Sequence, residues 1–181
     1  MKATELRLLL RESAKEYATA HGLPVDSSYA SALIFNEAAS NFCPASYEAI
    51  RRNPDWLSRI SKPHSKVAGV AEMQSSNSSD ALLMSVFCHP RISAWKGVAD
   101  LLGFVPGVPV FGFKPLVAKQ GTNGDDTEID LLLDDCFIEA KLTEKDFTDK
   151  KVTDVAKYTA FTEHFHTDNL PVSNGCFQNY Q

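Results

Sequence analysis

Residues 127–142 constrain the fold of this chain more than any other stretch, because they have the pattern of a tight β-hairpin. With Asp134 and Asp135 at the tip, Leu133 faces Cys136 across the two strands. Side chains alternate between the two faces of a strand. One face then holds apolar residues alone: Ile129, Leu131, Leu133, Cys136, Ile138, Ala140 and Leu142. A shift of one residue would turn this whole set toward water, so the register is strongly specified.

The opposite face of the predicted hairpin carries charge. In the same register Asp130 lies opposite Glu139, and Glu128 lies opposite Lys141. Two carboxylates that face each other across adjacent strands repel by about 0.2–1 kcal/mol. A divalent cation would offset the repulsion, since Mg²⁺ binds carboxylate oxygens together with waters and substrate phosphates. The neighbouring ammonium of Lys141 can orient a hydrolytic water or stabilise charge that develops on a phosphate.

This arrangement resembles a known signature. Asp130 followed by Glu139-Ala140-Lys141 looks like the D…(D/E)-x-K motif of the PD-(D/E)XK, or restriction-endonuclease-like, nuclease superfamily. The short motif alone occurs in many surface hairpins, where Glu128 and Lys141 would form an ordinary cross-strand ion pair. The hairpin context, the opposed carboxylates and the wholly apolar second face together favour the nuclease interpretation.

A second part of the resemblance lies upstream of the hairpin. Glu72, followed by the turn Ser78-Ser79-Asp80-Ala81 into an apolar helix, is similar to one branch of the superfamily, although Asp80 stands where that branch has Gln. A serine of this turn is placed to cap the helix that follows. After Lys141, Thr143 and the aromatic Phe147 continue the resemblance.

The resemblance implies a mechanism. Asp130 and Glu139 would hold Mg²⁺, with Mn²⁺ as a substitute, and the carbonyl of Ala140 would be a further ligand. Lys141 would position or activate the attacking water, and Glu72 would approach the metal. The ion would act as a Lewis acid and lower the pKa of bound water. The expected activity is hydrolysis of DNA phosphodiester bonds, in the manner of a restriction-type endonuclease, and a homodimer is compatible with it.

The length of 181 residues predicts one domain over 1–181, with a helical N-terminal part at 1–70 and a nuclease-like core at 71–181. The expected fold class is α/β (α+β), and the resemblance implies an αβββαβ core with extra N-terminal helices. In the resembling branch a Tyr-Gln pair opens a further helix. The final Tyr180-Gln181 therefore predicts a chain truncated at its C-terminus.

Hydrophobic periodicity and capping signals predict the remaining elements. One strand is expected over 110–119, directly before the hairpin. Trp56 is expected to anchor a short helix in a loop region. The predicted helices cover residues 4–21, 29–42, 46–51, 55–60, 82–88, 92–102 and 152–165.

The net charge of −5 argues against a nonspecific nucleic-acid binder, since affinity for DNA depends largely on Lys and Arg. Part of the acidity is local to the hairpin, where a metal ion would neutralise it. The charge keeps two alternatives open. One is a catalytically inactive nuclease-fold module that binds DNA or assembles with other proteins, and the other is a plain interaction domain with a solvent-facing acidic hairpin.

The remaining features concern the location of the protein. Its apolar runs are far shorter than the ~18 residues that a membrane span requires. The first residues have the pattern of an amphipathic helix rather than a signal peptide, which predicts a cytoplasmic protein without a membrane partner. Cys43, Cys88, Cys136 and Cys176 are dispersed and lack a C-x-x-C spacing, so free thiols are expected rather than an iron–sulfur site.

Overall fold

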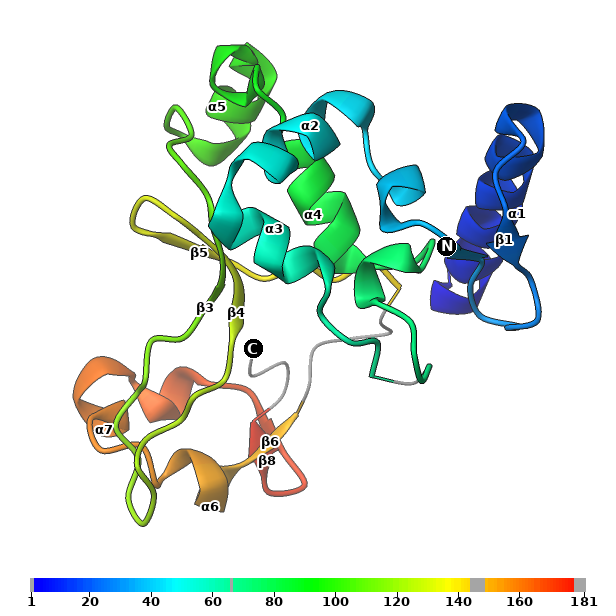
Figure 1. Cartoon of the computed structure of the whole chain (residues 1–181). Coiled ribbons are helices and arrows are strands. Elements are labelled where there is room, and N and C mark those ends of the chain that lie inside the picture. Colours follow the sequence, from blue (N-terminus) through cyan, green and yellow to red (C-terminus); the bar gives the residue numbers. More distant parts are fainter. Residues whose placement is uncertain (1, 66, 144–148, 178–181) are drawn as a thin grey trace.

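A computed structural model describes residues 2–65, 67–143 and 149–177 of the chain (Figure 1). Within these residues the fold is a mixture of seven α-helices and three small antiparallel sheets. The predicted α+β class is therefore confirmed, whereas the more specific αβββαβ order stays a prediction. None of the helices in the described residues is long and apolar enough to cross a membrane.

The central sheet has the strand order β3-β4-β5 and contains the predicted hairpin. Strand β3 covers Val110–Phe113, β4 covers Ile129–Leu133 and β5 covers Cys136–Ile138. Leu133 pairs with Cys136 and Leu131 with Ile138, which confirms the predicted register for these residues. The paired ladder ends there, before the predicted pair of Asp130 and Glu139. The predicted strand over 110–119 is correct only in its first four residues.

The apolar face of this hairpin packs against helix α4 (Ser79–Phe87). Leu131 and Leu133 are fully buried there with Leu83 of the helix. Each fully buried leucine contributes roughly 1.5–3 kcal/mol. A register shift would expose both leucines of β4, and this penalty holds the charged face of the hairpin in place.

Helices α2 (Pro44–Arg52), α3 (Pro54–Ile60) and α4 lie together on one side of the central sheet (Figure 1). Their contacts form one buried cluster that joins residues before and after position 70: Phe42, Ile50, Met73, Ala81, Met84 and Cys88. Local signals set their ends, since Pro44 occupies the first turn of α2 and Asn53 caps α3. The predicted cap of α4 is Ser78, which accepts a hydrogen bond from the Ala81 N–H at 3.1 Å.

Three further predictions concern this half of the molecule. Trp56 anchors α3 as expected, because its indole N–H donates to the Pro109 carbonyl at 2.9 Å. Of the cysteines expected to be thiols, Cys88 is buried and Cys43 is exposed. Burial raises the pKa of the Cys88 thiol to about 12. The helix predicted over 92–102 is divided into the 3₁₀ turn η3 (Ile92–Ala94) and helix α5 (Lys96–Leu102).

The predicted helix over 29–42 is wrong. Strand β2 (Ile34–Phe35) pairs there with β1 (Val25–Asp26), and the 3₁₀ turn η1 (Ala38–Asn41) follows. Four consecutive residues from Ala32 to Phe35 are buried, whereas a surface helix buries one stripe. The Leu33 N–H donates to the Ser76 hydroxyl at 3.0 Å, so a distant loop satisfies the backbone.

The predicted N-terminal helix is confirmed as α1 (Ala3–His21), which ends at Gly22 in the left-handed conformation. Ala18 of this helix packs with Leu33 and Phe35 in a second buried cluster. The Arg7 guanidinium donates to the Thr143 carbonyl at 2.9 Å. Helix α1 is thereby tied to the segment that follows Lys141.

The helix predicted over 152–165 is interrupted. It consists of the short helices α6 (Val152–Val155) and α7 (Phe161–His164), because residues 118 and 119 form backbone contacts with 158 and 159 between them. A small sheet of β6 (Lys150–Lys151), β8 (Cys176–Phe177) and β7 (Val172–Ser173) lies beside them (Figure 1). The predicted roles of Phe147 and of the pair Tyr180-Gln181 fall outside the described residues.

Candidate active site

The structure brings the three motif residues of the hairpin together. Asp130 lies in β4, and Glu139 and Lys141 lie in the segment that directly follows β5. The Asp130 carboxylate accepts a hydrogen bond from the Ala140 N–H at 2.9 Å, which holds it against the Glu139-Ala140-Lys141 segment. The Lys141 ammonium donates to the Glu139 carboxylate. All three side chains are partly buried, so their charges are only partly screened by water.

The environment of Asp130 disfavours its charged form. Burial raises the pKa of Asp130, and the nearby charges of Glu139 and Asp80 raise it further. The hydrogen bond from Ala140 and the charge of Lys141 act in the opposite direction but do not cancel this shift. A cation bound between Asp130 and Glu139 would remove the repulsion between the two carboxylates.

The alternative interpretation, in which Glu128 and Lys141 form an ordinary cross-strand ion pair, is wrong. Lys141 pairs with Glu139, whereas Glu128 pairs with Arg59 at 3.0 Å and lies 3.7 Å from the Lys62 ammonium. The paired register of the hairpin ends at Leu131 and Ile138, so residues 128 and 141 are no longer cross-strand neighbours.

A second group of charges adjoins Asp130. Asp80, in the first turn of α4, is almost fully buried and accepts hydrogen bonds from Arg59 and Lys62, both at 3.0 Å. Glu72 begins the 3₁₀ turn η2 (Glu72–Gln74), and its carboxylate lies 3.4 Å from Lys62. Burial lowers the pKa of Lys62, but the hydrogen bond and charge of Asp80 more than offset this, and the pKa lies above its ordinary value.

Sequence reasoning missed Arg59 and Lys62. Both come from the first seventy residues, at and just beyond the end of α3, where a cation is usually a solvated helix residue. One signal could have indicated them. Asp80 stands where the resembling branch has a neutral Gln. A carboxylate in this turn requires a cationic partner once it is buried.

Gly112 in β3 makes room for the Arg59 guanidinium. Its backbone has φ of 64°, and a Cβ at this position would lie 2.0 Å from an Nη atom of Arg59. The same Cβ would lie 3.2 Å from a Glu128 carboxylate oxygen. A glycine is therefore required here for two reasons, the left-handed conformation and the close approach of the ion pair.

Two hollows lie near the hairpin. One, of about 340 Å³, is lined by α4 and by residues 138–142, and Glu139 and Lys141 stand at its wall. A substrate that enters between α4 and this segment would reach both side chains. Among the described residues, no group of three or more His, Cys, Asp or Glu side chains could hold a metal ion.

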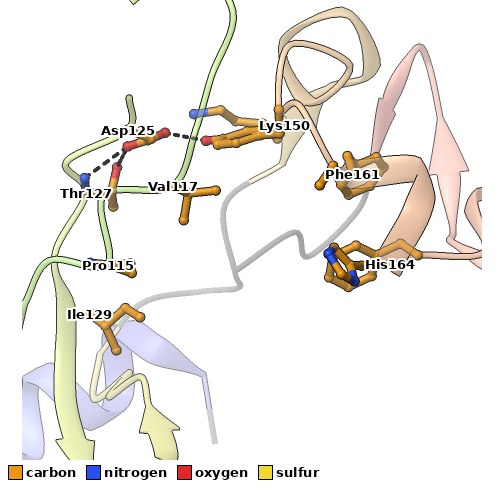
Figure 2. A pocket seen from close by; sticks show the side chains of 11 residues that line it. Pro115, Val117, Asp125, Thr127, Ile129, Lys150, Phe161 and His164 are labelled. Atoms are coloured by element: carbon orange, nitrogen blue, oxygen red, sulfur yellow. Dashed lines mark hydrogen bonds between the residues drawn. The ribbon is translucent and has the colours of Figure 1, made fainter. Parts of the chain in front are cut away.

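The other hollow, of about 400 Å³, lies between the loop before β4 and the C-terminal helices (Figure 2). Its walls are mainly apolar, with Val117 and Ile129 facing Phe161. At its edge Asp125 accepts hydrogen bonds from Thr127 and from the Tyr158 hydroxyl, which hold its pKa well below the usual range. The motif residues Asp130, Glu139 and Lys141 do not line this pocket.

Comparison with known proteins places the chain among the restriction endonucleases, in agreement with the PD-(D/E)XK resemblance. It belongs to the family described as Restriction Endonuclease associating with ARP, whose model matches residues 13–181. No curated protein and no solved structure gives a significant match.

Proposed function

We propose that this chain is a metal-dependent nuclease that hydrolyses DNA phosphodiester bonds as a restriction-type endonuclease. The observation that carries the proposal is the grouping of Asp130, Glu139 and Lys141 on one hairpin, in a chain that belongs to a restriction endonuclease family. The net charge of −5 makes metal binding a condition for approach to a polyanion, because the acidic hairpin would otherwise repel phosphates.

The donor set suits Mg²⁺, with Mn²⁺ as a substitute. Asp130 and Glu139 supply carboxylate oxygens, and the carbonyl of Ala140 is a further candidate ligand. An ion held by so few protein groups would keep positions for waters and for a substrate phosphate, as Mg²⁺ usually does. When bound, the ion supplies Lewis acidity at the phosphate and lowers the pKa of a coordinated water.

The side chains have separate tasks in this mechanism. Asp130, held by the Ala140 N–H, and Glu139 bind and neutralise the cation. Lys141 orients the attacking water, because its ammonium is fixed by Glu139 and has two further N–H donors. Glu72 acts at the border of the site through its ion pair with Lys62. The substrate backbone would lie in the hollow between α4 and residues 138–142.

We further propose that residues 1–181 form one domain built on an αβββαβ core, in which residues 1–70 complete the site rather than form a separate unit. The shared cluster of Phe42 and Ile50 with Met73 and Met84 supports this arrangement. So does the reach of Arg59 from α3 to Asp80 and Glu128. A homodimer, which would cut both strands of a duplex, is compatible with these features.

Incubation of the full chain with supercoiled plasmid and Mg²⁺ tests the proposal. Nicked or linear DNA is expected with the unchanged protein, and none with Asp130→Ala or in the presence of EDTA. Asp135→Ala is the matched control, because Asp135 is an exposed carboxylate at the tip of the same hairpin.

Two outcomes would contradict the proposal. Binding of DNA without cleavage under any divalent ion would indicate an inactive nuclease-fold module. An identical melting temperature with and without Mg²⁺, together with no effect of Lys141→Ala, would indicate a plain interaction domain with an acidic hairpin.

A further inference from the structure

The hollow of about 400 Å³ between the loop before β4 and helix α7 has no part in the proposed cleavage site (Figure 2). Its volume is in the range of small-ligand sites, about 300–1,000 Å³. Aliphatic side chains of Val117 and Ile129 lie opposite Phe161. Aromatic side chains supply much of the remaining wall: Tyr158, Phe161, His164 and Phe165. These walls suit a flat, largely apolar ring.

Two phenylalanines of this wall form a stacked pair. The ring centroids of Phe161 and Phe165 are 5.0 Å apart, and their planes are inclined by 24°. Phe161 is buried, whereas Phe165 is 54% exposed, so part of its ring is accessible to a ligand. Because aromatic rings attract one another in offset stacks, Phe165 offers a stacking surface to a ring that enters the pocket.

The carboxylate at the edge of the pocket is already engaged within the protein. Asp125 accepts hydrogen bonds from the N–H and the hydroxyl of Thr127 and from the Tyr158 hydroxyl. It also lies 3.5 Å from the Lys119 ammonium. A carboxylate has about four acceptor positions, so these contacts leave Asp125 little capacity to select a ligand by its hydrogen bonds. Stacking is therefore the main attraction that the pocket offers.

The charges at the pocket favour an anion next to the ring. Lys119 offsets the charge of Asp125, and Lys150 adds a further positive charge to the lining. A nucleotide unit of DNA combines a ring that stacks on aromatic side chains with a phosphate that a lysine attracts. Ile129 of the pocket directly precedes Asp130, and successive residues of a strand face opposite sides. Nucleotides that flank a phosphate held at Asp130 would therefore lie near this pocket.

We infer that the pocket binds one unstacked base of a DNA strand, beside the phosphate that is cleaved. Phe165 stacks on the base, and Lys150 attracts the adjoining phosphate. The pocket accepts any of the four bases, since every base has a π face and Asp125 is already engaged. This inference rests on the proposed function, which makes DNA the substrate.

Binding of two single-stranded oligonucleotides to the full chain tests the inference. One is a fluorescein-labelled pentamer of thymidine, and the other is a pentamer of the same sugar-phosphate backbone without bases, so both carry the same charge. Anisotropy is measured in Mg²⁺ with the Lys141→Met protein, which keeps both carboxylates of the hairpin and is expected to cleave slowly. The thymidine pentamer is expected to bind about tenfold more tightly, the usual order for one stacked base.

Three variants in this background assign the difference to the pocket. Phe165→Ala is expected to remove most of it by weakening the thymidine pentamer alone. Phe137→Ala is the matched control and should change neither affinity, because Phe137 is 57% exposed and stacks on Phe113 but does not line the pocket. Lys150→Met should weaken both pentamers alike, since it acts on the phosphates.

Equal affinity for the two pentamers would overturn the inference, as would equal losses from Phe165→Ala and Phe137→Ala. Thymidine monophosphate that binds as tightly as the thymidine pentamer would assign the pocket to a free nucleotide and would also overturn it. The expected affinities together with an absence of plasmid cleavage by the unchanged protein would support the base pocket and contradict the nuclease. Should Phe165→Ala fail to fold, Phe165→Leu carries the same prediction, because it keeps apolar volume without an aromatic face.

Discussion

Asp130 is expected to make the metal-free protein less stable, and replacing it with Asn should raise the melting temperature while abolishing cleavage. Burial and the charge of Glu139 raise the pKa of Asp130, so the ionised form is disfavoured in the folded state. Asparagine keeps an oxygen that can accept the hydrogen bond from the Ala140 N–H but removes the charge. Sites that bind metals often retain this kind of local destabilisation.

The charge of Glu139 acts on Asp130 from just beyond the last paired residues, so the known cost of like charges on adjacent strands gives the scale of the effect. Opposed carboxylates cost about 0.2–1 kcal/mol. For a domain of this size 1 kcal/mol corresponds to a shift of roughly 2–4 °C, so Asp130→Asn is expected to melt about 0.4–4 °C higher in EDTA. A group with a raised folded pKa destabilises the protein above its unfolded value of 3.8. The higher melting temperature of Asp130→Asn should therefore be observed at pH 7, and its difference from the unchanged protein should shrink as the pH falls toward 3.8.

Thermal unfolding in EDTA and in Mg²⁺ is the measurement. In Mg²⁺ the unchanged protein should melt at the higher temperature of the two. An ion present at a hundred times its Kd adds about 2.7 kcal/mol to the stability of a protein that binds it in the folded state, and only the unchanged protein retains the site. Asp135→Asn at the exposed hairpin tip should melt like the unchanged protein in both buffers. If Asp130→Asn melted lower in EDTA, or gained as much from Mg²⁺ as the unchanged protein, the proposed metal site would be refuted.

Three further predictions follow from other residues. Lys141→Met should slow single-turnover plasmid cleavage by about 10²-fold or more while the Mg²⁺-dependent rise in Tm is retained, because it removes a donor and no metal ligand. Gly112→Ala should lower the free energy of unfolding by at least about 1–2 kcal/mol in urea titrations, whereas Gly97→Ala in α5, with open space around it, should raise it by about 0.5–1 kcal/mol. Asp125 has a lowered folded pKa, so its stabilising contribution is present above 3.8 and is lost as the pH falls below that value. Asp125→Asn should thus reduce the urea midpoint at pH 7 and weaken its decline in acid.

The hairpin could be predicted from the sequence because one face is apolar without exception. Leu131 and Leu133 fix both the register and the side on which Asp130 emerges. The family could also be recognised from the same stretch, since the motif residues are close in sequence. Local pattern sufficed for α1, α3 and α4 for the same reason, as their caps and apolar stripes are near neighbours along the chain.

The parts that sequence reasoning missed depend on distant partners. Ile34 and Phe35 are extended because Val25 and the loop at Ser76 pair with this segment, and nothing local distinguishes the run from a helix. Arg59 and Lys62 have the appearance of solvated helix residues until the buried Asp80 is placed beside them. The predicted register placed Glu128 opposite Lys141, but the ladder stops short of both residues.

The two cations that pair with Asp80 both come from the first seventy residues, which matters for any attempt to shorten this protein. A fragment that begins at residue 71 would retain each acidic side chain discussed above but would lose both Arg59 and Lys62. It would leave Asp80 without either counter-charge and would also remove Phe42 and Ile50 from the buried cluster around α4. The proposed catalytic motif and the helices that precede it are thus expected to fold as a single unit.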